Sequence, residues 1–218
     1  YTTINKSTDY FNTKLYTGTG SSQAITGVGF QPDWVWAKRR GSAEGHSLFD
    51  AVRGVQKRIV SNDDGTEATN ATFLTSFDTD GFTMGGSDAV NGSDNYASWN
   101  WKANGAGSAN TDGSINTTAT SASTTSGFSI VQYTGTGSAG TIGHGLGAVP
   151  KMILVKRTSS SDSWTVGHNS MGWGKYLRLD GTAAEASNTN TWNNTTPTST
   201  VFSVNHDDVN ASGVTFIA

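Results

Sequence analysis

The glutamates are the first residues to test for catalytic chemistry, because a retaining glycosidase needs two carboxylates about 5 Å apart. The chain has three glutamates, Glu44, Glu67 and Glu185. No two of them lie two or four residues apart, the spacing that would place both carboxylates on one face of a strand. Glu67 and Glu185 also stand at matching places in the two halves of the chain, which favours a structural role. The sequence therefore predicts no glycosidase and no other enzyme.

Histidine chemistry finds equally little support. His46, His144, His168 and His206 are scattered, without the short spacings of zinc sites. No Gly-x-Ser-x-Gly elbow precedes a helix, so a Ser-His-Asp hydrolase is not indicated. His144 stands in Gly-His-Gly-Leu-Gly and is expected to cap a turn. The chain has no cysteine, which removes disulfides and thiolate metal sites.

Short acidic clusters raise the question of calcium. They occupy residues 63–65, 78–81 and 207–208. Calcium requires six to eight oxygen ligands, and none of the three clusters has the twelve-residue loop pattern. Asp-Gly is also what a tight turn requires without any metal. We expect turn chemistry and no cofactor, with calcium as the alternative left open.

One polar group is peculiar to the first half of the chain: His46, Asp50 and Arg53. We interpret Asp50 and Arg53 as an ion pair that pins a loop across a sheet. The alternative is that these three residues contact a glycan or a protein partner.

The seven tryptophans suggest a second binding hypothesis, because exposed aromatic rings can stack on sugar rings. Four of them lie in strand-like runs and are expected to be core residues: Trp34, Trp36, Trp99 and Trp101. Three lie in or beside Gly-, Ser- and Asn-rich stretches and are the better candidates for exposed ligand-binding residues: Trp164, Trp173 and Trp192. Even for these three, packing inside the fold is the interpretation we favour over ligand contact.

The elements that must position these residues are strands nearly everywhere. Trp34–Arg39 and Met152–Arg157 are short apolar runs after a proline and read as central strands. Tyr96–Trp101 alternates, and an Asp-Thr-Asp-Gly turn leads into Phe82–Met84. Only His46–Val55 could hold a helical turn. Many short strands with frequent turn signals predict an all-β fold of antiparallel sandwiches, which we expect to be jelly-roll-like.

The chain also repeats itself. Tyr-Thr-Gly-Thr-Gly occurs at residues 16–20 and again at residues 133–137. Each copy continues through a Gly-rich stretch to a proline, an apolar run and Lys-Arg. This order predicts a tandem duplication in which Trp34–Arg39 and Met152–Arg157 occupy equivalent places.

The repeat sets the expected domains. We predict a first β-sandwich at residues 1–104, a small polar linker at 105–112 and a second β-sandwich at 113–218. The second repeat should begin with the strand-like stretch Ser114–Ser123, which has a shorter equivalent at Thr2–Ser7.

The two ends of the chain carry a further expectation. The last three residues, Phe216 to Ala218, match Tyr96 to Ser98, after which the first repeat continues with an aromatic strand segment. We therefore expect that the second sandwich is truncated in its C-terminal strand and that the gene continues. The chain also starts at Tyr1 without a methionine, which suggests a fragment at the front.

The composition of the chain argues against nucleic acid and membrane as partners. The net charge is −3 and charged residues make up 14% of the chain, well below the usual share of about 25%. No basic patch indicates nucleic-acid binding. No apolar run approaches the roughly 18 residues of a membrane helix, so membrane insertion is not expected.

Several motifs together carry a resemblance to a known family. They are GFQPDWVWAKRR, HSLFDAVRG, TSFDTDGFTMGG and YASWNWKA in the first half, and GFSIVQYTGTG and TIGHGLGAVPKMILVKR in the second. In this order they resemble tandem concanavalin-A-like or SPRY-like domains of tailed-bacteriophage virion proteins. The second half departs from the first in lacking the aspartate-arginine segment.

The resemblance implies a non-enzymatic structural protein on the virion surface, either a tail-fibre or receptor-binding module or a capsid decoration. Its partners would be other virion proteins, further copies of itself, and a host-surface glycan or receptor. The family offers no established catalytic or ligand-binding residues to carry over. The alternative is a carbohydrate-binding module of a cell-surface or secreted adhesin.

Overall fold

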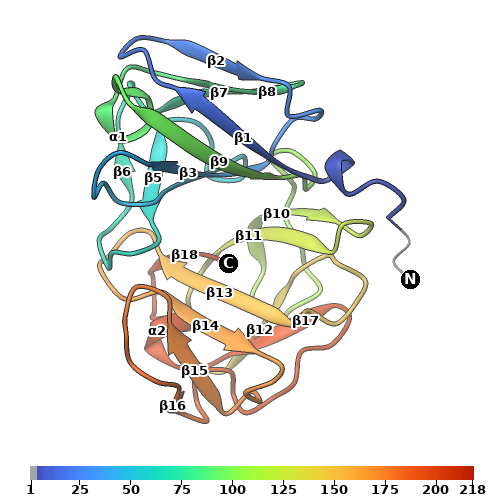
Figure 1. Cartoon of the computed structure of the whole chain (residues 1–218). Helices are drawn as coiled ribbons and strands as arrows, with labels where there is room; N and C mark the ends of the chain where they lie inside the picture. The colour runs from blue at the N-terminus through green and yellow to red at the C-terminus, as the bar shows by residue number, and fades with distance from the viewer. Residues whose placement is uncertain (1–3) are drawn as a thin grey trace. The chain divides into compact units, whose positions relative to one another are not determined.

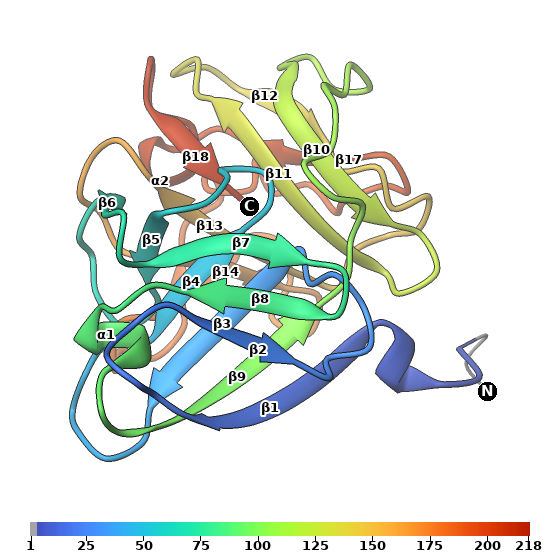
Figure 2. The same cartoon turned by 90° about the horizontal axis from the view of Figure 1, so that it is seen from above.

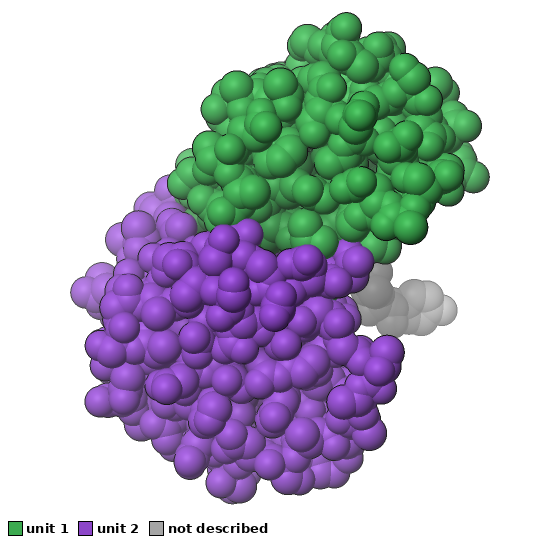
Figure 3. Space-filling view, turned by 90° about the vertical axis from the view of Figure 1, so that its left-hand side faces the viewer, with its two compact units in different colours: residues 1–61, 67–106 green, residues 62–66, 107–218 purple. Residues whose placement is uncertain are grey.

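The computed structural model describes residues 4–218 and is all-β, with 40% of the chain in strands and 5% in helices. All strand pairs between named strands are antiparallel (Figure 1). The chain forms two compact units, shown in different colours in Figure 3. Unit 1 consists of residues 1–61 and 67–106, and unit 2 of residues 62–66 and 107–218.

The larger sheet of unit 1 has six strands in the order β1-β9-β3-β4-β5-β6. Their bounds are β1 Phe11–Thr17, β9 Asn95–Trp101, β3 Trp34–Arg39, β4 Ser47–Asp50, β5 Lys57–Val60 and β6 Ala68–Thr69. The predicted central strand Trp34–Arg39 is confirmed, because β3 pairs with β9 on one side and β4 on the other.

A three-stranded sheet, β2-β8-β7, forms the second layer of unit 1. Its strands are β2 Gln23–Thr26, β8 Gly81–Met84 and β7 Leu74–Asp78. The predicted turn is confirmed, since Asp78 and Gly81 close the β7–β8 hairpin around two residues. Side chains from both sheets form one core, which makes the unit sandwich-like: Ile25, Val28, Phe30, Val35, Ala37, Phe49, Phe73, Leu74, Phe82, Met84, Ala89 and Val90.

The larger sheet of unit 2 has seven strands in the order β10-β11-β18-β13-β14-β15-β16. Their bounds are β10 Thr117–Ser123, β11 Phe128–Thr134, β18 Thr215–Ile217, β13 Met152–Arg157, β14 Thr165–His168, β15 Lys175–Arg178 and β16 Ala186–Ser187. A two-stranded sheet pairs β12 Gly140–Gly143 with β17 Val201–Val204. The core again joins both layers: Ile115, Val131, Tyr133, Ile142, Ile153, Val155, Trp173, Trp192, Phe202, Val204, Val209 and Phe216.

The two units share one strand order and one register. The order β1-β9-β3-β4-β5-β6 corresponds to β11-β18-β13-β14-β15-β16. In unit 1 Tyr96 of β9 lies opposite Arg39, and in unit 2 Phe216 of β18 lies opposite Arg157. The predicted equivalence of the two Pro-apolar-Lys-Arg runs, and the match of Phe216 with Tyr96, are therefore confirmed.

The repeated pentad holds the same turn in each unit. The hydroxyl of Tyr16 donates to the carbonyl of Val90 at 2.6 Å, and that of Tyr133 donates to Val209 at 2.6 Å. Both acceptors lie in single-turn helices, α1 Asp88–Asn91 and α2 Asp207–Asn210. The first glycine of each pentad packs directly on the residues that follow the helix: a Cβ on Gly18 would lie 2.0 Å from the carbonyl oxygen of Gly92.

The helical turn expected in His46–Val55 is confined to the end of that segment, where the N–H of Gly54 donates to the carbonyl of Asp50 at 3.1 Å. Ser47–Asp50 is strand β4, and a short turn follows it. Pairing of β4 with β3 decides the conformation, because this strand has both neighbours it needs to satisfy its backbone. Besides α1 and α2, the described residues contain one 3₁₀ turn, η1 Ser7–Asp9. No helix among residues 4–218 is long and apolar enough to cross a membrane.

The strand expected at the start of the second repeat is confirmed as β10, which pairs with β11. Its shorter counterpart was placed at Thr2–Ser7, which lies partly outside the described residues. The described part of that stretch forms no strand and leads into η1. The two units divide between residues 106 and 107.

Candidate functional site

Asp50, Arg53 and Glu67 form a buried ion network in unit 1. Arg53 Nε donates to Asp50 Oδ2 at 2.5 Å, and the backbone N–H of Arg53 donates to Asp50 Oδ1 at 2.7 Å. Arg53 also pairs with Glu67 at 3.1 Å and donates to the carbonyl of Leu48 at 3.2 Å. The predicted loop-pinning ion pair is confirmed. Because the Asp50 and Arg53 side chains are 0% exposed, the alternative that they touch a ligand is corrected.

His46 does not join that network. The indole N–H of Trp36 donates to His46 Nδ1 at 2.8 Å, and the two rings meet edge to face. Burial, with a smaller contribution from the charge of Lys38, lowers the pKa of His46. A lowered pKa favours the neutral ring, which can accept this hydrogen bond. The structure thus separates His46 from the two residues with which the sequence grouped it.

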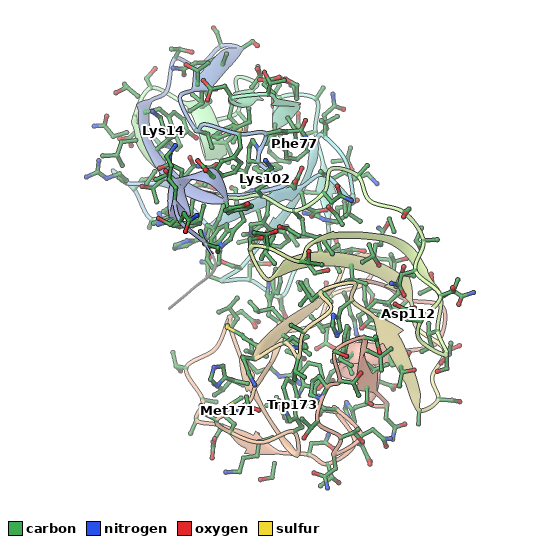
Figure 4. The ribbon with its side chains drawn as sticks, turned by 90° about the vertical axis from the view of Figure 1, so that its right-hand side faces the viewer. Lys14, Phe77, Lys102, Asp112, Met171 and Trp173 are labelled. Atoms are coloured by element: carbon green, nitrogen blue, oxygen red, sulfur yellow. The ribbon has the colours of Figure 1, made fainter. Side chains whose placement is uncertain are left out.

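The packing interpretation of Trp164, Trp173 and Trp192 is confirmed, and their nomination as exposed ligand-binding residues is corrected. They are 1%, 6% and 1% exposed. Trp173, labelled in Figure 4, and Trp192 pack edge to face in the core of unit 2, 5.8 Å between ring centroids. A Cβ on Gly167 would lie 2.7 Å from one ring and 2.8 Å from the other. A glycine inside strand β14 is the signal that a bulky group packs against the backbone there.

The four tryptophans expected in the core of unit 1 instead share the opposite face of its larger sheet. Trp34 lies opposite Trp101 across the β3–β9 pair, and Trp36 lies opposite Trp99. None belongs to the core cluster, and each ring is partly exposed. We call these four residues the tryptophan face.

The alternation of β3 and β9 explains this placement. Val35 and Ala37, between and after the two β3 tryptophans, point into the core and are fully buried. On β9 the intervening residue Asn100 is buried, and its amide donates to the carbonyl of Asn12 at 3.0 Å. With one face used for the core, the tryptophans must occupy the other. The sequence showed apolar residues on both faces of β3 but not which face the core would use.

The tryptophan face is an aromatic surface with polar groups at its ends. The rings of Trp36 and Trp99 lie edge to face at 6.5 Å, and Phe11 packs against Trp101 at 4.8 Å. Lys38, on the same face of β3, donates to the carbonyls of Arg39 and Ser42 at 2.6 and 3.0 Å. Flat apolar rings beside hydrogen-bonding groups suit ligands that have both apolar and hydroxylated surfaces, as sugars do.

The three glutamates are engaged in separate ion pairs. Glu44 pairs with Arg58 at 3.5 Å, Glu67 pairs with Arg53, and Glu185 pairs with Lys175. Each carboxylate thus has a cationic partner, as expected for structural residues.

Backbone contacts explain two of the three acidic clusters, and in the third Asp208 pairs with Arg178. Asp80 accepts from the N–H groups of Gly29 and Gly27 at 2.6 and 3.0 Å, and these bonds lower its pKa. Asp63 accepts from Gly65 within its own turn. Among residues 4–218, no group of three or more His, Cys, Asp and Glu side chains could hold a metal ion.

His144 caps a turn, as predicted. Its Nδ1 accepts from the backbone N–H of Leu146 at 3.2 Å, and Nε2 lies 3.2 Å from the carbonyl of Thr198. Burial lowers the pKa of this histidine.

Comparison with known families gives one match. The fold and the tryptophan face describe an all-β, sandwich-like protein with an aromatic surface on one sheet. A family model described as a domain of unknown function (DUF7483) matches residues 6–218, and the chain belongs to this family. No curated protein and no solved structure shows significant similarity to the chain.

Proposed function

We propose that this protein is a non-enzymatic virion protein of a tailed bacteriophage, displayed on the particle as a tail-fibre, receptor-binding or decoration module. The motifs that resemble such proteins form the central strands β3, β9, β11 and β13, so the resemblance concerns the parts that build the fold. Each unit would then be a jelly-roll sandwich of the concanavalin-A-like type. Its partners would be other virion proteins and further copies of itself.

The tryptophan face carries the binding part of this proposal. It presents four partly exposed tryptophans on two adjacent strands of unit 1. In unit 2 the β13 residues equivalent to Trp34 and Trp36 are Met152 and Leu154, which are not aromatic. Aromatic rings stack on the apolar faces of sugar rings, so the ligand would be a host-surface glycan. Such a site needs no catalytic residue, which agrees with the separate ion pairs of the glutamates.

Binding is expected to be weak at each site. A millimolar dissociation constant corresponds to about −4 kcal/mol. Several copies on one particle would raise the overall affinity without any new contact.

A glycan array probed with the intact protein tests the proposal. A Trp36→Ala/Trp99→Ala double variant should lose binding while still unfolding cooperatively, with a thermal midpoint lowered by the loss of the Trp36–His46 bond and the ring contact. The matched control is Met152→Ala, which changes an exposed apolar residue at the position of unit 2 equivalent to Trp34. Equal binding by the double variant and the wild type would refute the tryptophan face as the contact surface.

The second candidate function, a carbohydrate-binding module of a cell-surface or secreted adhesin, rests on the same face. Mass spectrometry of purified phage particles separates the two proposals. The protein should be present in the particles if it is a virion protein and absent from them if it is an adhesin.

A further inference from the structure

Strand β1 has an open edge where its counterpart in unit 2 is covered. Among residues 4–218, the one strand that pairs with β1 is β9. The equivalent strand β11 lies between β18 and β10. Figure 2 shows β1 as the outer strand of its sheet and β10 beside β11. The two repeats therefore differ by one strand at this edge.

The alternating hydrogen-bond pattern of the β1–β9 pair shows which backbone groups of β1 face the open edge. The N–H of Lys102 donates to the carbonyl of Tyr10, and the β1–β9 register continues from there without a shift. Backbone groups of an antiparallel strand point alternately to its two sides. Asn12 and Lys14 therefore bond to β9, whereas Phe11 and Leu15 point their backbone groups to the open side.

The same alternation in the β11–β18 pair of unit 2 identifies the backbone groups of β11 that bond to β10. Val131 exchanges hydrogen bonds with Ala218 at 2.8 Å in both directions, so Val131 faces β18. Its neighbours Ile130 and Gln132 must then face β10. Gln132 is the residue equivalent to Leu15, since both precede the tyrosine of the pentad. On β1 the equivalent groups of Phe11 and Leu15 have no strand partner among residues 4–218, whereas the N–H of Thr13, which corresponds to Ile130, donates to Asn12 Oδ1 at 2.9 Å.

The edge of β1 has only part of the usual protection. Natural proteins shield long edge strands with proline, bulges and charged side chains, inward-pointing ones included, because an exposed edge pairs with other chains. β1 has seven residues, no proline and an unbroken register. Its one charged residue, Lys14, labelled in Figure 4, lies on the inward side near Gly27 and is such a device, while Leu15 is 68% exposed. The backbone groups of Phe11 and Leu15 are what this edge offers to a strand partner.

We propose that the open edge of β1 accepts an antiparallel strand from a partner polypeptide, with small Ser, Thr and Ala side chains. β10, Thr-Thr-Ala-Thr-Ser-Ala-Ser, shows the chemistry that fits. It places Ala119 opposite Gln132, Ser121 opposite Ile130 and Ser123 opposite Phe128, so small residues lie against larger ones. On β1 the corresponding residues are Leu15, Thr13 and Phe11, of which Leu15 and Phe11 are large and would be accommodated by small partner side chains. This strand site is separate from the tryptophan face and does not depend on its ligand.

A peptide copy of residues 116–124 tests the proposal, with hydrogen exchange of the intact protein as the measurement. At millimolar peptide, the amides of Phe11 and Leu15 should exchange at least several-fold more slowly. A peptide carrying Ser121→Pro is the control, because proline removes a ladder donor. Unchanged exchange in segment 11–17, equal protection by the proline peptide, or changes confined to segment 128–134 would each overturn the proposal.

Leu15→Pro is the matched protein variant. The N–H of Leu15 points away from β9, so proline should keep the β1–β9 pairing and the thermal midpoint but abolish peptide protection. Leu15→Lys, which adds an edge charge, should weaken protection if the proline variant does not fold. Protection that rises with protein concentration without peptide would show that the occupant is a second copy of the chain and would overturn the proposed partner.

Discussion

The two units hold the turn of the repeated pentad by the same tyrosine contacts, but their tryptophans lie in different places. Tyr16 stacks on Tyr96 at 5.1 Å between ring centroids, and Tyr133 stacks on Phe216 at 5.2 Å. These pairs, with the tyrosine hydroxyl bonds to α1 and α2, occupy the same places in both folds. The tryptophans do not: in unit 1 they line the outward face of a sheet, and in unit 2 Trp173 and Trp192 fill the core. The shared residues are those the fold requires, and the others can serve a unit's own function.

Charged residues show the same contrast. Unit 1 buries Asp50 and Arg53 behind β4, whereas the corresponding place after β14 has no such pair. Unit 2 instead uses Arg178, which donates to Thr165 Oγ1 at 2.6 Å and pairs with Asp208. One sandwich can therefore be pinned by either arrangement.

The largest expected effect on stability comes from breaking the buried Asp50–Arg53 ion pair of unit 1. Arg53→Ala leaves the buried carboxylate of Asp50 without its cation, which should cost about 3–5 kcal/mol in the free energy of unfolding. Urea denaturation of the intact protein measures this. The matched control is Lys175→Ala in the exposed pair with Glu185, where about 0–1 kcal/mol is expected. Equal losses of unfolding free energy in the two variants would contradict the contrast between a buried pair in unit 1 and an exposed pair in unit 2.

The next effect should be equal in both units. Asn91 accepts from the N–H of Thr19 and donates to the carbonyls of Ser21 and Gly85, and Asn210 makes the matching bonds to Thr136 and Ser138. Replacing either asparagine with alanine leaves buried backbone groups unpaired and should cost about 1–3 kcal/mol per lost bond. Denaturant midpoints of the two single variants check this. A loss of stability in only one of the two variants would contradict the view that Asn91 and Asn210 play the same role.

Acid sensitivity is the third prediction, and each unit supplies one histidine. Burial lowers the folded-state pKa of His46 in unit 1 and of His144 in unit 2. In both cases the unfolded chain binds the proton more readily, so stability is full above an ordinary pKa of about 6.5 and falls as the pH drops below it. Thermal midpoints between pH 8 and pH 5 should show the fall. His144→Gln should flatten its slope, and an unchanged slope would count against this origin.

The smallest effect is expected from the paired glutamates. Glu185→Gln should change the free energy of unfolding by less than about 1 kcal/mol, because its ion pair with Lys175 is exposed to solvent. The protein should show no hydrolysis of any polysaccharide. Turnover of a glucan that disappears in Glu67→Gln or Glu185→Gln would defeat the non-enzymatic account.

Much of the fold could be predicted from the sequence because the repeat acts as an internal alignment. It placed β3 on β13 and Phe216 on Tyr96, and the apolar runs identified the central strands. Local patterns alone missed strand β4 at Ser47–Asp50, where pairing with β3 decides the conformation and leaves one helical turn after the strand. Only the folded structure shows such pairing.

The candidate site was less predictable for a related reason. Alternation showed that Trp34 and Trp36 share one face of β3, but both faces of that strand carry apolar residues. The position of the second sheet decides which face becomes core. For Trp173 and Trp192, a loop rich in polar residues suggested exposure, although Gly167 opens space for both rings. Burial depends on contacts between distant segments, which composition does not report.

The central claim is that ligand contact belongs to the tryptophan face of unit 1 and not to the tryptophans of unit 2. Fluorine NMR of protein labelled with 5-fluorotryptophan tests it directly, with each resonance assigned by a Trp→Phe variant. During titration with a glycan that binds, the resonances of Trp36 and Trp99 should shift while those of Trp173 and Trp192 stay fixed. Shifts confined to Trp173 and Trp192, or none at the tryptophan face, would contradict the account.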